Sequence, residues 1–449
     1  MSTGLLGYGA YVPRHRLGRR VVAGYDEDST TMAVAAAQAA LPAGNTPQAL
    51  LFATSTPAYA DKTNATAIHA ALGLPEQVLA ADLCGTGRSA FAAIRWAAQS
   101  GGLAVCADVR VGRPGSADEK LGGDGAAALL FGDGDPIAEV LGTASRTEEF
   151  LDRWRAPNSV TGQQWEERFG FEKYTRLIRS TAADALNAAG LADADHVVLA
   201  CPNTAVGKRA ATLVKGQKSV TTSPVGFGGA ADAAIALCGV LDTADPGDTI
   251  LVLSATDGCD ALVLRATANL ATARQRSPLA GQLAGGLQVP QLTYLSWRGL
   301  IEFEPPRRPE PDRVGAPPAS RAAAWKFGLI GARCGDCDFV HLPPARVCRR
   351  CAVVDQMTPV PVSGLEGTVV TYTVDRLAYS PSPPMVQAVV DVDGGGRCTV
   401  EVADAEQDAL HVGARVRFSF RRLFTAGDIH DYFWKAVLVD ERLREERGS

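Results

Sequence analysis

An internal duplication constrains the fold of this chain more than any other sequence feature. Residues 51–62 read LFATSTPAYADK and residues 198–209 read VLACPNTAVGKR, so each segment begins as an apolar strand, breaks at a proline and ends on a cation. An alanine-rich helical run precedes each segment, and a glycine turn, a second alanine-rich helix and another apolar strand follow it. This order indicates an α/β fold in which helices cover parallel strands. Because the order occurs twice, we expect two pseudo-equivalent halves.

Two Cys-x-x-Cys pairs stand ten residues apart in the segment CGDCDFVHLPPARVCRRC, residues 334–351. Thiolates held on two tight turns in this way can close a tetrahedral zinc site. The predicted ligands are Cys334, Cys337, Cys348 and Cys351. Four thiolates leave no open coordination position, so the zinc is expected to hold structure rather than to catalyse, and His341 is not needed as a ligand. The alternatives are a ribbon that no longer binds metal and a redox dithiol.

The character of the chain changes near Arg276, where the periodic pattern stops. A proline-rich, charged stretch that ends at Arg321 predicts an extended linker. Beyond Cys351, short alternating runs with glycine and aspartate turns predict about five strands of a small antiparallel barrel. The expected domains are an N-terminal half over 1–170, a C-terminal half over 171–275, a linker over 276–324, a zinc ribbon over 325–355 and a barrel over 356–449.

Composition narrows the class of function. The chain has 449 residues, 46% hydrophobic and 21% charged, which predicts two or three globular domains. Its net charge of -5 comes from interspersed charges of both signs, so nucleic acid is not an expected partner. The layout of a signal peptide and an apolar run of roughly 18 to 20 residues are both missing, so we expect a cytoplasmic protein without membrane association.

Five further cysteines stand among apolar or glycine-rich residues, as buried free thiols usually do. They are Cys84, Cys106, Cys201, Cys238 and Cys259.

Several motifs in about the first 275 residues resemble those of known enzymes. They are GLLGYGAYVPRHRL, ATSTP, DLCGTGRSA, GDGAAALLFGD and SATDGCDALVLR. These segments resemble 3-hydroxy-3-methylglutaryl-CoA synthase and ketoacyl synthase III, which are relatives in the thiolase superfamily. The resemblance implies a five-layered αβαβα fold, usually a dimer, with acyl-CoA or acyl-carrier thioesters as substrates.

From about Trp325 to Glu445, the cysteine pairs and the alternating runs resemble the domain-of-unknown-function-35 family. That resemblance implies a rubredoxin-like zinc ribbon joined to an OB fold. Such domains accompany thiolase-type enzymes as an acyl-CoA-associated subunit, so a thiolase-type partner enzyme is a further expectation. OB folds also occur in nucleic-acid binders, but these strands lack the basic and aromatic alternation that stacking on bases requires.

The resemblance also shows which catalytic groups this chain lacks. Ala200 in LACPN stands where the family's histidine belongs, and Phe227 in VGFGG stands where its asparagine belongs. Ser55 in ATSTP stands where the synthases carry glutamate. Acyl transfer needs a nucleophile, and enolate formation needs a base and groups that hold the oxyanion, so altered chemistry is expected.

The nucleophile position has two possible registers. Alignment on Asp82-Leu83 places Gly87 at the family's cysteine, whereas the C-x-x-G pattern and the helix end select Cys84. A helix N-terminus lowers the pKa of a thiol, which favours a catalytic role for Cys84. Packing of a small residue under a glycine turn is the alternative.

Loops after the strands carry further candidate catalytic groups, since open sheets bind ligands at strand ends. Tyr59 and Asp61 follow the first-half strand, Cys201 and Asn203 follow the matching second-half strand, and Asp257 lies with Asp260 on the closing glycine turn. Tyrosine and aspartate can run enolate chemistry without a covalent acyl-enzyme. The alternative for each residue is turn capping or packing.

Two hypotheses on function follow from these residues. The first is an enzyme that makes or breaks a carbon–carbon bond of an acyl-CoA or acyl-carrier thioester, of aldol, retro-aldol or Claisen type. In that enzyme Lys208 and Arg209 are candidates to bind a CoA phosphate, although solvated cations at a helix start are the alternative. The second is a catalytically silent subunit that binds thioesters or serves as a scaffold in a multienzyme complex.

Overall fold

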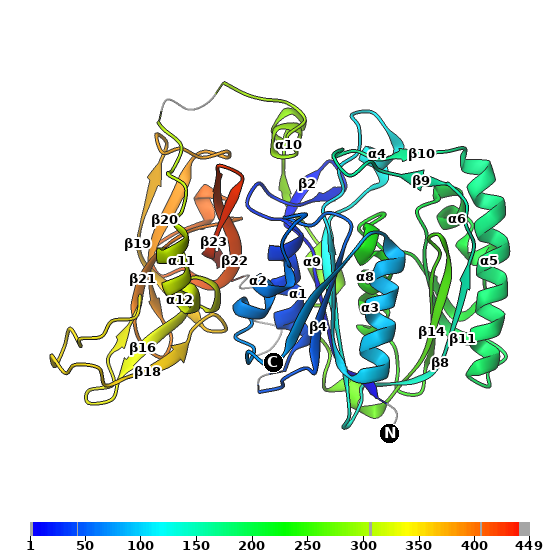
Figure 1. Cartoon of the computed structure of the whole chain (residues 1–449), viewed down its shortest axis with the longest axis horizontal. Helices are drawn as coiled ribbons and strands as arrows, with labels where there is room; N and C mark the ends of the chain where they lie inside the picture. The colour runs from blue at the N-terminus through cyan, green and yellow to red at the C-terminus, as the bar shows by residue number, and fades with distance from the viewer. Residues whose placement is uncertain (1–2, 43, 305–307, 405, 440–449) are drawn as a thin grey trace. The chain divides into compact units, whose positions relative to one another are not determined.

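One ten-stranded mixed sheet contains the predicted duplication (Figure 1). In spatial order its strands are β12 (Gly216–Thr221), β11 (Ala194–Ala200), β13 (Thr249–Ser254), β14 (Gly258–Ala266), β8 (Ala138–Thr147), β1 (Gly4–Tyr11), β7 (Gly125–Gly132), β6 (Gly102–Asp108), β4 (Ala49–Thr54) and β5 (Leu79–Cys84). From the two outer edges inward, β12-β11-β13-β14-β8 matches β5-β4-β6-β7-β1 strand for strand. The halves meet where Leu5 of β1 pairs with Ala138 of β8. The expectation of two equivalent halves is confirmed.

The computed structural model describes residues 3–42, 44–304, 308–404 and 406–439. The outer ends of the predicted ranges 1–170 and 356–449 therefore lie outside the described residues. By their contacts the residues form two units. The first consists of Met1–Gly24, Asp28–His69 and Leu74–Gln288, and the second consists of Tyr25–Glu27, Ala70–Gly73 and Val289–Ser449.

Four helices complete the layers of the first unit, namely α1 (Ser29–Ala40), α3 (Gly87–Ser100), α5 (Glu167–Ala188) and α8 (Asp232–Leu241). α3 and α8 each contact strands of both halves and form the middle layer. α1 packs on β1, β6 and β7, and α5 packs on β8 and β14. Figure 1 shows α5 along the right-hand edge. The five layers that the resemblance implied are therefore α1, the first-half strands, α3 with α8, the second-half strands and α5.

Alanine and glycine let these helices approach the sheet closely. A Cβ on Gly9 of β1 would lie 2.7 Å from the carbonyl oxygen of Ala36 in α1. Ala33 and Ala37 of the same helix are fully buried. The alanine excess of this region therefore follows from close helix-on-sheet packing.

An edge strand in each half adds to the predicted pattern. β5 pairs in parallel with β4, and β12 pairs in parallel with β11. The remaining elements of the first unit are β2 (His15–Leu17), β3 (Arg20–Val22), α2 (Ala65–Ala71), α4 (Ala117–Leu121), β9 (Arg153–Trp154), β10 (Gln163–Gln164), α6 (Thr204–Lys208), α7 (Ala210–Leu213), the 3-10 turns η1 (Gly229–Ala231) and η2 (Ala268–Ala271), α9 (Leu279–Leu283) and β15 (Leu287–Gln288).

The segment 276–324 differs from the extended linker that we expected. It contains α9, β15, α10 (Gln291–Trp297) and α11 (Ala316–Arg321), and α12 (Ala323–Gly328) begins at its end. Pro278 and Pro290 are the N-caps of α9 and α10, and α11 has proline in its first turn. Proline suits the start of a helix because its φ is already helical, so a proline-rich composition also fits short helices.

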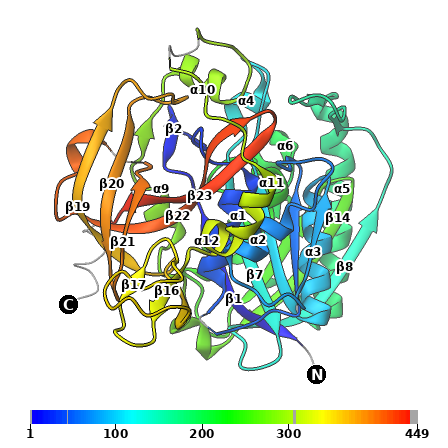
Figure 2. The same cartoon turned by 60° about the vertical axis from the view of Figure 1, so that its left-hand side comes forward.

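The second unit contains the ribbon and the barrel. Its three-stranded ribbon has the order β17 (Val340–His341), β16 (Ile330–Cys334) and β18 (Met357–Pro361). Five antiparallel strands follow in the order β21 (Arg397–Glu401), β20 (Met385–Val392), β19 (Glu366–Asp375), β22 (Arg415–Ala426) and β23 (Ile429–Leu438), with the 3-10 turn η3 (Gln407–Ala409) (Figure 2). A bridge between Val402 and Ala436 brings the first and last of these strands together. The five predicted strands are confirmed.

None of the helices in the described part of the chain is long and apolar enough to cross a bilayer.

Candidate functional site

The carboxyl ends of the parallel strands gather candidate groups at one edge of the large sheet. β4 ends at Thr54 and leads into Ser55, β5 ends at Cys84, β6 ends at Asp108 and β11 ends at Ala200. Thr54 and Cys84 are register partners in the parallel pair of β4 and β5. Because open sheets bind ligands beyond the carboxyl ends of their strands, this edge is the candidate site.

Asp108 is fully buried and connects this edge to the second half of the fold. Its Oδ1 accepts hydrogen bonds from the Thr54 hydroxyl at 2.9 Å and the Ser55 N–H at 2.7 Å. Its Oδ2 accepts from the Ser55 hydroxyl at 2.7 Å and the Ala230 N–H at 2.6 Å. A Cβ on Gly229 would lie 2.0 Å from Oδ2, so this approach requires glycine. Asp108 is absent from the predicted site residues, although a carboxylate that ends an apolar strand is a usable signal.

Ser55 belongs to a group of arginines around an aromatic ring. Arg110 Nη1 donates to Ser55 Oγ at 3.0 Å, and the guanidinium lies 5.2 Å from the ring centre of Phe227. Arg153 lies 5.5 Å from the same ring and forms an ion pair with Asp118. One hydroxyl, two guanidinium groups and one aromatic ring are thus combined around Ser55 and Phe227. The arginines are also absent from the predicted residues, because only the folded chain brings them to Phe227.

Cys84 does not lie at a helix N-terminus. It ends strand β5 and is exposed, whereas α3 begins at Gly87 with Thr86 as its N-cap. Desolvation of the thiol and the negative charges of Asp82 and Asp108 raise the pKa of Cys84. The expectation that Cys84 is a buried thiol is therefore wrong, and so is the premise of a pKa lowered by a helix dipole.

The other cysteines of the first unit follow the prediction more closely. Cys106, Cys238 and Cys259 are buried, and burial raises the pKa of Cys106 and of Cys259 to about 12. Cys201 is half-buried.

Gly87, the other register, faces the second half of the fold. A Cβ on Gly87 would lie 3.1 Å from Thr256 Oγ1, 3.7 Å from Ser254 Oγ and 3.6 Å from the carbonyl oxygen of Gly229. Ser254 ends β13, which is the strand equivalent to β6. The first residue of α3 therefore has two hydroxyl groups opposite it, and it carries no side chain that would fill the space between.

Asp257 lies beside the start of α3. The Thr86 hydroxyl hydrogen-bonds to its carboxylate, and the Arg88 guanidinium donates to its carbonyl oxygen. Burial raises the pKa of Asp257, although the Thr86 bond and the charge of Arg88 lower it. Arg88 also reaches Asp260 Oδ1 at 3.5 Å. The structure thus places Asp257, one of the predicted catalytic residues, beside the glycine turn that follows Cys84, another predicted catalytic residue.

Half-buried Cys201 lies beside two buried polar side chains on the second-half side. Burial raises its pKa well above the ordinary range for a thiol. Tyr174 and Asp152 are its neighbours, and each is 1% exposed. The charge of Asp152 raises the pKa of Cys201, and the charges of Cys201 and Asp152 raise the pKa of Tyr174. Burial is also the largest cause that raises the pKa of Tyr174 and of Asp152. Neither residue is among the predicted ones, since the two lie far from Cys201 in sequence.

Asn203 is fully buried and caps α6. Its Oδ1 accepts from the N–H groups of Ala205 at 3.1 Å and Val206 at 3.2 Å, and its Nδ2 donates to the carbonyl of Glu167 at 2.9 Å. These bonds hold local structure, which is the capping role that the sequence left open as the alternative.

The remaining candidates lie on loops and helix ends. Tyr59 is half-buried, and Asn64 Nδ2 donates to its carbonyl oxygen at 2.9 Å, whereas Asp61 is exposed. Lys208 is exposed in the last turn of α6, and the guanidinium of Arg209 lies 4.8 Å from the ring centre of Phe171. Catalysis by Tyr59 and Asp61 and phosphate binding by the two cations remain predictions.

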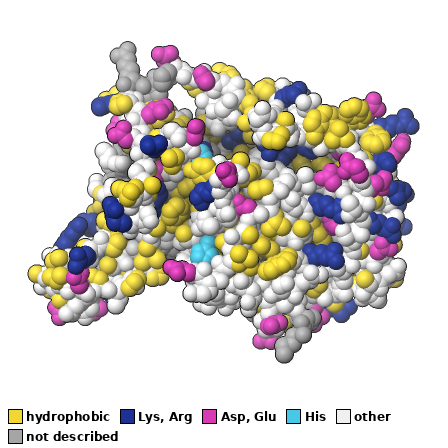
Figure 3. Space-filling model, viewed as in Figure 1, with side chains coloured by type: hydrophobic (Ala, Val, Ile, Leu, Met, Phe, Trp, Pro, Cys, Tyr) yellow, Lys and Arg dark blue, Asp and Glu magenta, His cyan; other side chains and the backbone are white. Residues whose placement is uncertain are grey.

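Surface charge on one face is mixed. Figure 3 shows Lys and Arg side chains interspersed with acidic ones over the right-hand edge, where α5 lies. Lys173 of that helix pairs with Glu148 at 2.8 Å, and Arg168 pairs with Glu172 at 3.4 Å. On this face the basic side chains of the described residues thus alternate with acidic ones.

The four predicted zinc ligands come together in the ribbon. Their sulfur atoms lie within 4.8 Å of one another, and the pairs Cys334–Cys351 and Cys337–Cys348 are each 3.6 Å apart. These separations are too long for disulfides and suit a tetrahedron with Zn–S bonds of about 2.3 Å. Backbone N–H groups of Arg350 and Cys351 donate to the sulfur of Cys348 at 3.3 and 3.5 Å. The donor set fits a structural zinc ion, and buried His341 stands outside it.

Two family models match this C-terminal region. Residues 326–354 match the rubredoxin-like zinc ribbon domain of ChsH2, and residues 359–421 match the C-terminal OB-fold domain of ChsH2. The expected zinc ribbon and OB fold are therefore confirmed.

Relatives of known name match the larger part of the chain. A hydroxymethylglutaryl-CoA synthase from Methanocella arvoryzae is 30% identical over 298 residues, which are 58% of this chain and 86% of that protein. The chain belongs to the hydroxymethylglutaryl-CoA synthase family. A hydroxymethylglutaryl-CoA synthase from Methanopyrus kandleri is 29% identical over 318 residues, covering 62% of this chain and 91% of that protein.

Solved structures of two kinds of enzyme have the same fold as this chain. An HMG-CoA synthase complexed with CoA has a TM-score of 0.58 at 16% identity, over 68% of this chain and 92% of that one. The 3-oxoacyl-(acyl carrier protein) synthase III from Pseudomonas aeruginosa has a TM-score of 0.53 at 21% identity, over 60% of this chain and 98% of that one. The thiolase-like fold is confirmed.

Proposed function

We propose that this protein makes or breaks a carbon–carbon bond next to the carbonyl of an acyl-CoA or acyl-carrier thioester, and that it does so without a covalent acyl-enzyme. Membership of the hydroxymethylglutaryl-CoA synthase family supports a condensing-type enzyme. One solved relative is an HMG-CoA synthase complexed with CoA, and another is the curacin pathway HMG synthase in complex with an acetyl donor-ACP. These complexes support thioesters of either carrier as substrates here.

The arrangement around the start of α3 carries this proposal. Gly87 is the first residue of α3 and faces the hydroxyls of Thr256 and Ser254. The Asp257 carboxylate is hydrogen-bonded to Thr86, the residue before Gly87. Burial raises the pKa of Asp257, which favours its protonated form, so this carboxyl group can act as an acid or a base, and fixed hydroxyls can donate to an oxyanion. In this proposal Asp257 supplies the acid–base group, and Ser254 and Thr256 supply the oxyanion donors beside Gly87.

In the cleavage direction, the Asp257 carboxylate takes the proton of a β-hydroxyl group on the substrate. The bond between the α- and β-carbons then breaks, a carbonyl compound leaves, and the electron pair forms the thioester enolate. Ser254 and Thr256 donate hydrogen bonds to the enolate oxygen, and the Asp257 carboxyl returns the proton to the α-carbon. Condensation runs through the same steps in reverse, and Cys84 is not acylated in either direction.

Turnover of a thioester panel tests the proposal. The purified chain should cleave or form β-hydroxyacyl thioesters of CoA or of an acyl carrier protein. Asp257→Asn should lower kcat by about 10²-fold or more, in line with the loss of a general acid–base group. Cys84→Ala should retain activity within about threefold. Asp184→Asn is the matched control, because Asp184 forms an exposed ion pair with Arg146 on the surface.

Alkylation separates this chemistry from a covalent one. Because the pKa of Cys84 is raised, iodoacetamide should label Cys84 no faster than it labels glutathione at pH 7.5, and thioesters should not protect the residue. Rapid, thioester-protected labelling together with loss of activity in Cys84→Ala would establish an acyl-enzyme and overturn the non-covalent route.

A thioester-binding subunit without catalysis of its own is the second candidate function. The replacement of the family's histidine by Ala200 and the use of Asn203 as a helix cap favour it. In this case the chain, which we propose to be a homodimer, would present thioesters to a thiolase-type partner enzyme. Binding of an acyl-CoA without turnover, and turnover only after the partner is added, would select this function over the first.

A further inference from the structure

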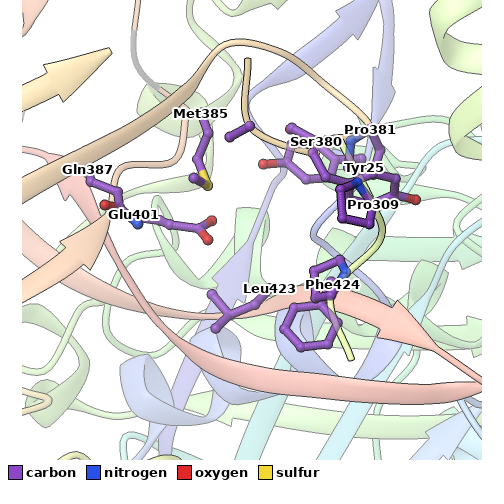
Figure 4. Close-up of a pocket in the computed structure, with 12 residues that line it drawn as sticks. Tyr25, Pro309, Ser380, Pro381, Met385, Gln387, Glu401, Leu423 and Phe424 are labelled. Carbon is purple, nitrogen blue, oxygen red and sulfur yellow. The ribbon is translucent and has the colours of Figure 1, made fainter. Parts of the chain in front are cut away.

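A cavity of about 340 Å³ lies in the second unit, away from the residues of the proposed thioester chemistry. Three aromatic side chains, Tyr25, Tyr379 and Phe424, contribute to its wall together with Met385 and Leu423. Figure 4 shows Tyr25, Phe424, Met385 and Leu423 around an open space. Its volume is in the range of small-molecule sites, which are mostly apolar with a few placed polar groups.

Glu401 supplies the charge of this cavity. It is the one ionisable acid or base, tyrosines aside, among the described residues that line the space. Figure 4 shows its carboxylate pointing into the cavity. The side chain is 20% exposed, so it is largely removed from water. A desolvated carboxylate strongly favours a cation at its free side.

Lys435 holds Glu401 in this position from behind. Lys435 Nζ lies 2.8 Å from Glu401 Oε2 and 3.0 Å from Asp26 Oδ2, and its side chain is 0% exposed. Its ammonium group also donates to the Tyr25 hydroxyl at 3.3 Å and lies 5.0 Å from the centre of that ring. Lys435 is thus shared between two carboxylates, so it does not neutralise Glu401 alone.

Arg421 forms ion pairs with three buried carboxylates, one of which, Asp26, also pairs with Lys435. It is 2% exposed and pairs with Glu27 at 2.7 Å, with Asp404 at 2.6 Å and with Asp26 at 3.5 Å. Arg421 therefore pairs with Glu27, Asp404 and Asp26, while Glu401 pairs with Lys435.

We propose that this cavity binds a small organic cation, an amine or quaternary ammonium compound with an apolar body. The cationic nitrogen would pair with Glu401, and the rings of Tyr25, Tyr379 and Phe424 would contact the apolar body and the cation face-on, as aromatic side chains do in ammonium sites. This site is independent of the proposed thioester chemistry, because none of its lining residues belongs to the first unit.

Calorimetric titration of the full-length, zinc-loaded chain tests the site with three probes of similar size. Benzyltrimethylammonium should bind at least tenfold more tightly than benzyl alcohol, and benzoate should bind most weakly. Equal affinity for the cation and the alcohol, or the absence of measurable binding by the cation, overturns the proposal.

Variants locate the binding. Glu401→Gln keeps an acceptor for Lys435 and should reduce the preference for the cation over the alcohol to about twofold or less. Glu366→Gln is the matched control, since Glu366 pairs with Arg415 at 3.3 Å outside the cavity, and it should retain the preference. Met385→Trp narrows the space and should weaken both probes at least tenfold. Unchanged binding in Met385→Trp means that the probe sits elsewhere and overturns the site, even if Glu401→Gln fails to fold.

Discussion

The Ser55 hydroxyl donates a hydrogen bond of 2.7 Å to Oδ2 of Asp108, and the Ser55 N–H donates another of 2.7 Å to Oδ1. Asp108 is 0% exposed, and it also accepts from the Ala230 N–H of the second half. A single buried carboxylate therefore ties the end of β4 to the turn that precedes α8. The shape of the candidate site depends on this connection.

Asp108→Asn should destabilise the chain by about 2–4 kcal/mol, because an amide NH2 would face donors in place of an acceptor. Ser55→Ala should cost about 1 kcal/mol. The loss in the double variant should be smaller than the sum, since both changes remove the same bonds. Guanidinium unfolding measures all three. Asp184→Asn on the surface is the control, and an Asp108→Asn loss no larger than that of the control would contradict the role of Asp108.

Removal of zinc should unfold the ribbon. Without metal the four sulfur atoms lose the bonds that hold two chain turns together, and structural zinc sites supply folding energy directly. Hydrogen exchange with and without a chelator should show loss of protection in β16 and β18. Metal analysis should give about one zinc per chain.

The strands of the first unit provide the internal control for that experiment. Amides of β4 and β11 should keep their protection, because no zinc ligand lies near them in the sequence or within the first unit. Ribbon protection that ignores a strong chelator would count against a structural zinc site.

Arg421→Met should cost about 3–5 kcal/mol, because it removes the guanidinium group that pairs with the buried carboxylates of Glu27 and Asp404. Arg397→Met is the matched control. Arg397 pairs with Asp391 at 2.6 Å on the surface, with side chains 58% and 49% exposed, and its loss should cost about 0–1 kcal/mol. Urea unfolding at two salt concentrations compares them. Equal losses from the two variants would show that the Arg421 pairs are not effectively buried.

Asp232 should make stability fall between about pH 4 and pH 7. Burial raises its pKa from 3.8 to about 7, although the Gly228 N–H bond lowers it. In that window the folded chain holds a proton that the unfolded chain has released, so the contribution is favourable at low pH and is lost as pH rises. Asp232→Asn should match the wild type near pH 4 and exceed its stability at pH 8 by up to about 4 kcal/mol.

The pH series needs the same surface control. Asp184→Asn should shift the unfolding free energy by a similar small amount at each pH, because its carboxylate is about half exposed. A wild-type curve that stays parallel to that of Asp232→Asn from pH 4 to pH 8 would mean that Asp232 is ionised throughout.

Local and periodic signals explain what could be predicted. The two halves follow from repeated helix and strand periodicity, and the barrel strands follow from alternation between turns. The zinc ligands follow from spacing, because two residues between cysteines suffice to set a tight turn. In each case the physical constraint acts over a few residues. The expectation that Cys84 lies at the start of a helix was wrong for a related reason: the sequence pattern of the short edge strand β5 is not distinct, so the end of the strand at Cys84 was not recognised.

The sequence by itself determined the layered halves, the OB strands and the metal ligands, since their constraints are carried by neighbouring residues. Only the tertiary structure decided which groups meet at the candidate site and in the cavity. Asp108 meets Ala230, Gly87 faces Thr256, and Lys435 reaches Glu401 because packing joins residues that the chain keeps apart. Such contacts depend on where strands and helices end and on how burial changes the pKa of charged groups. The pattern of neighbouring residues in the sequence determines neither of them.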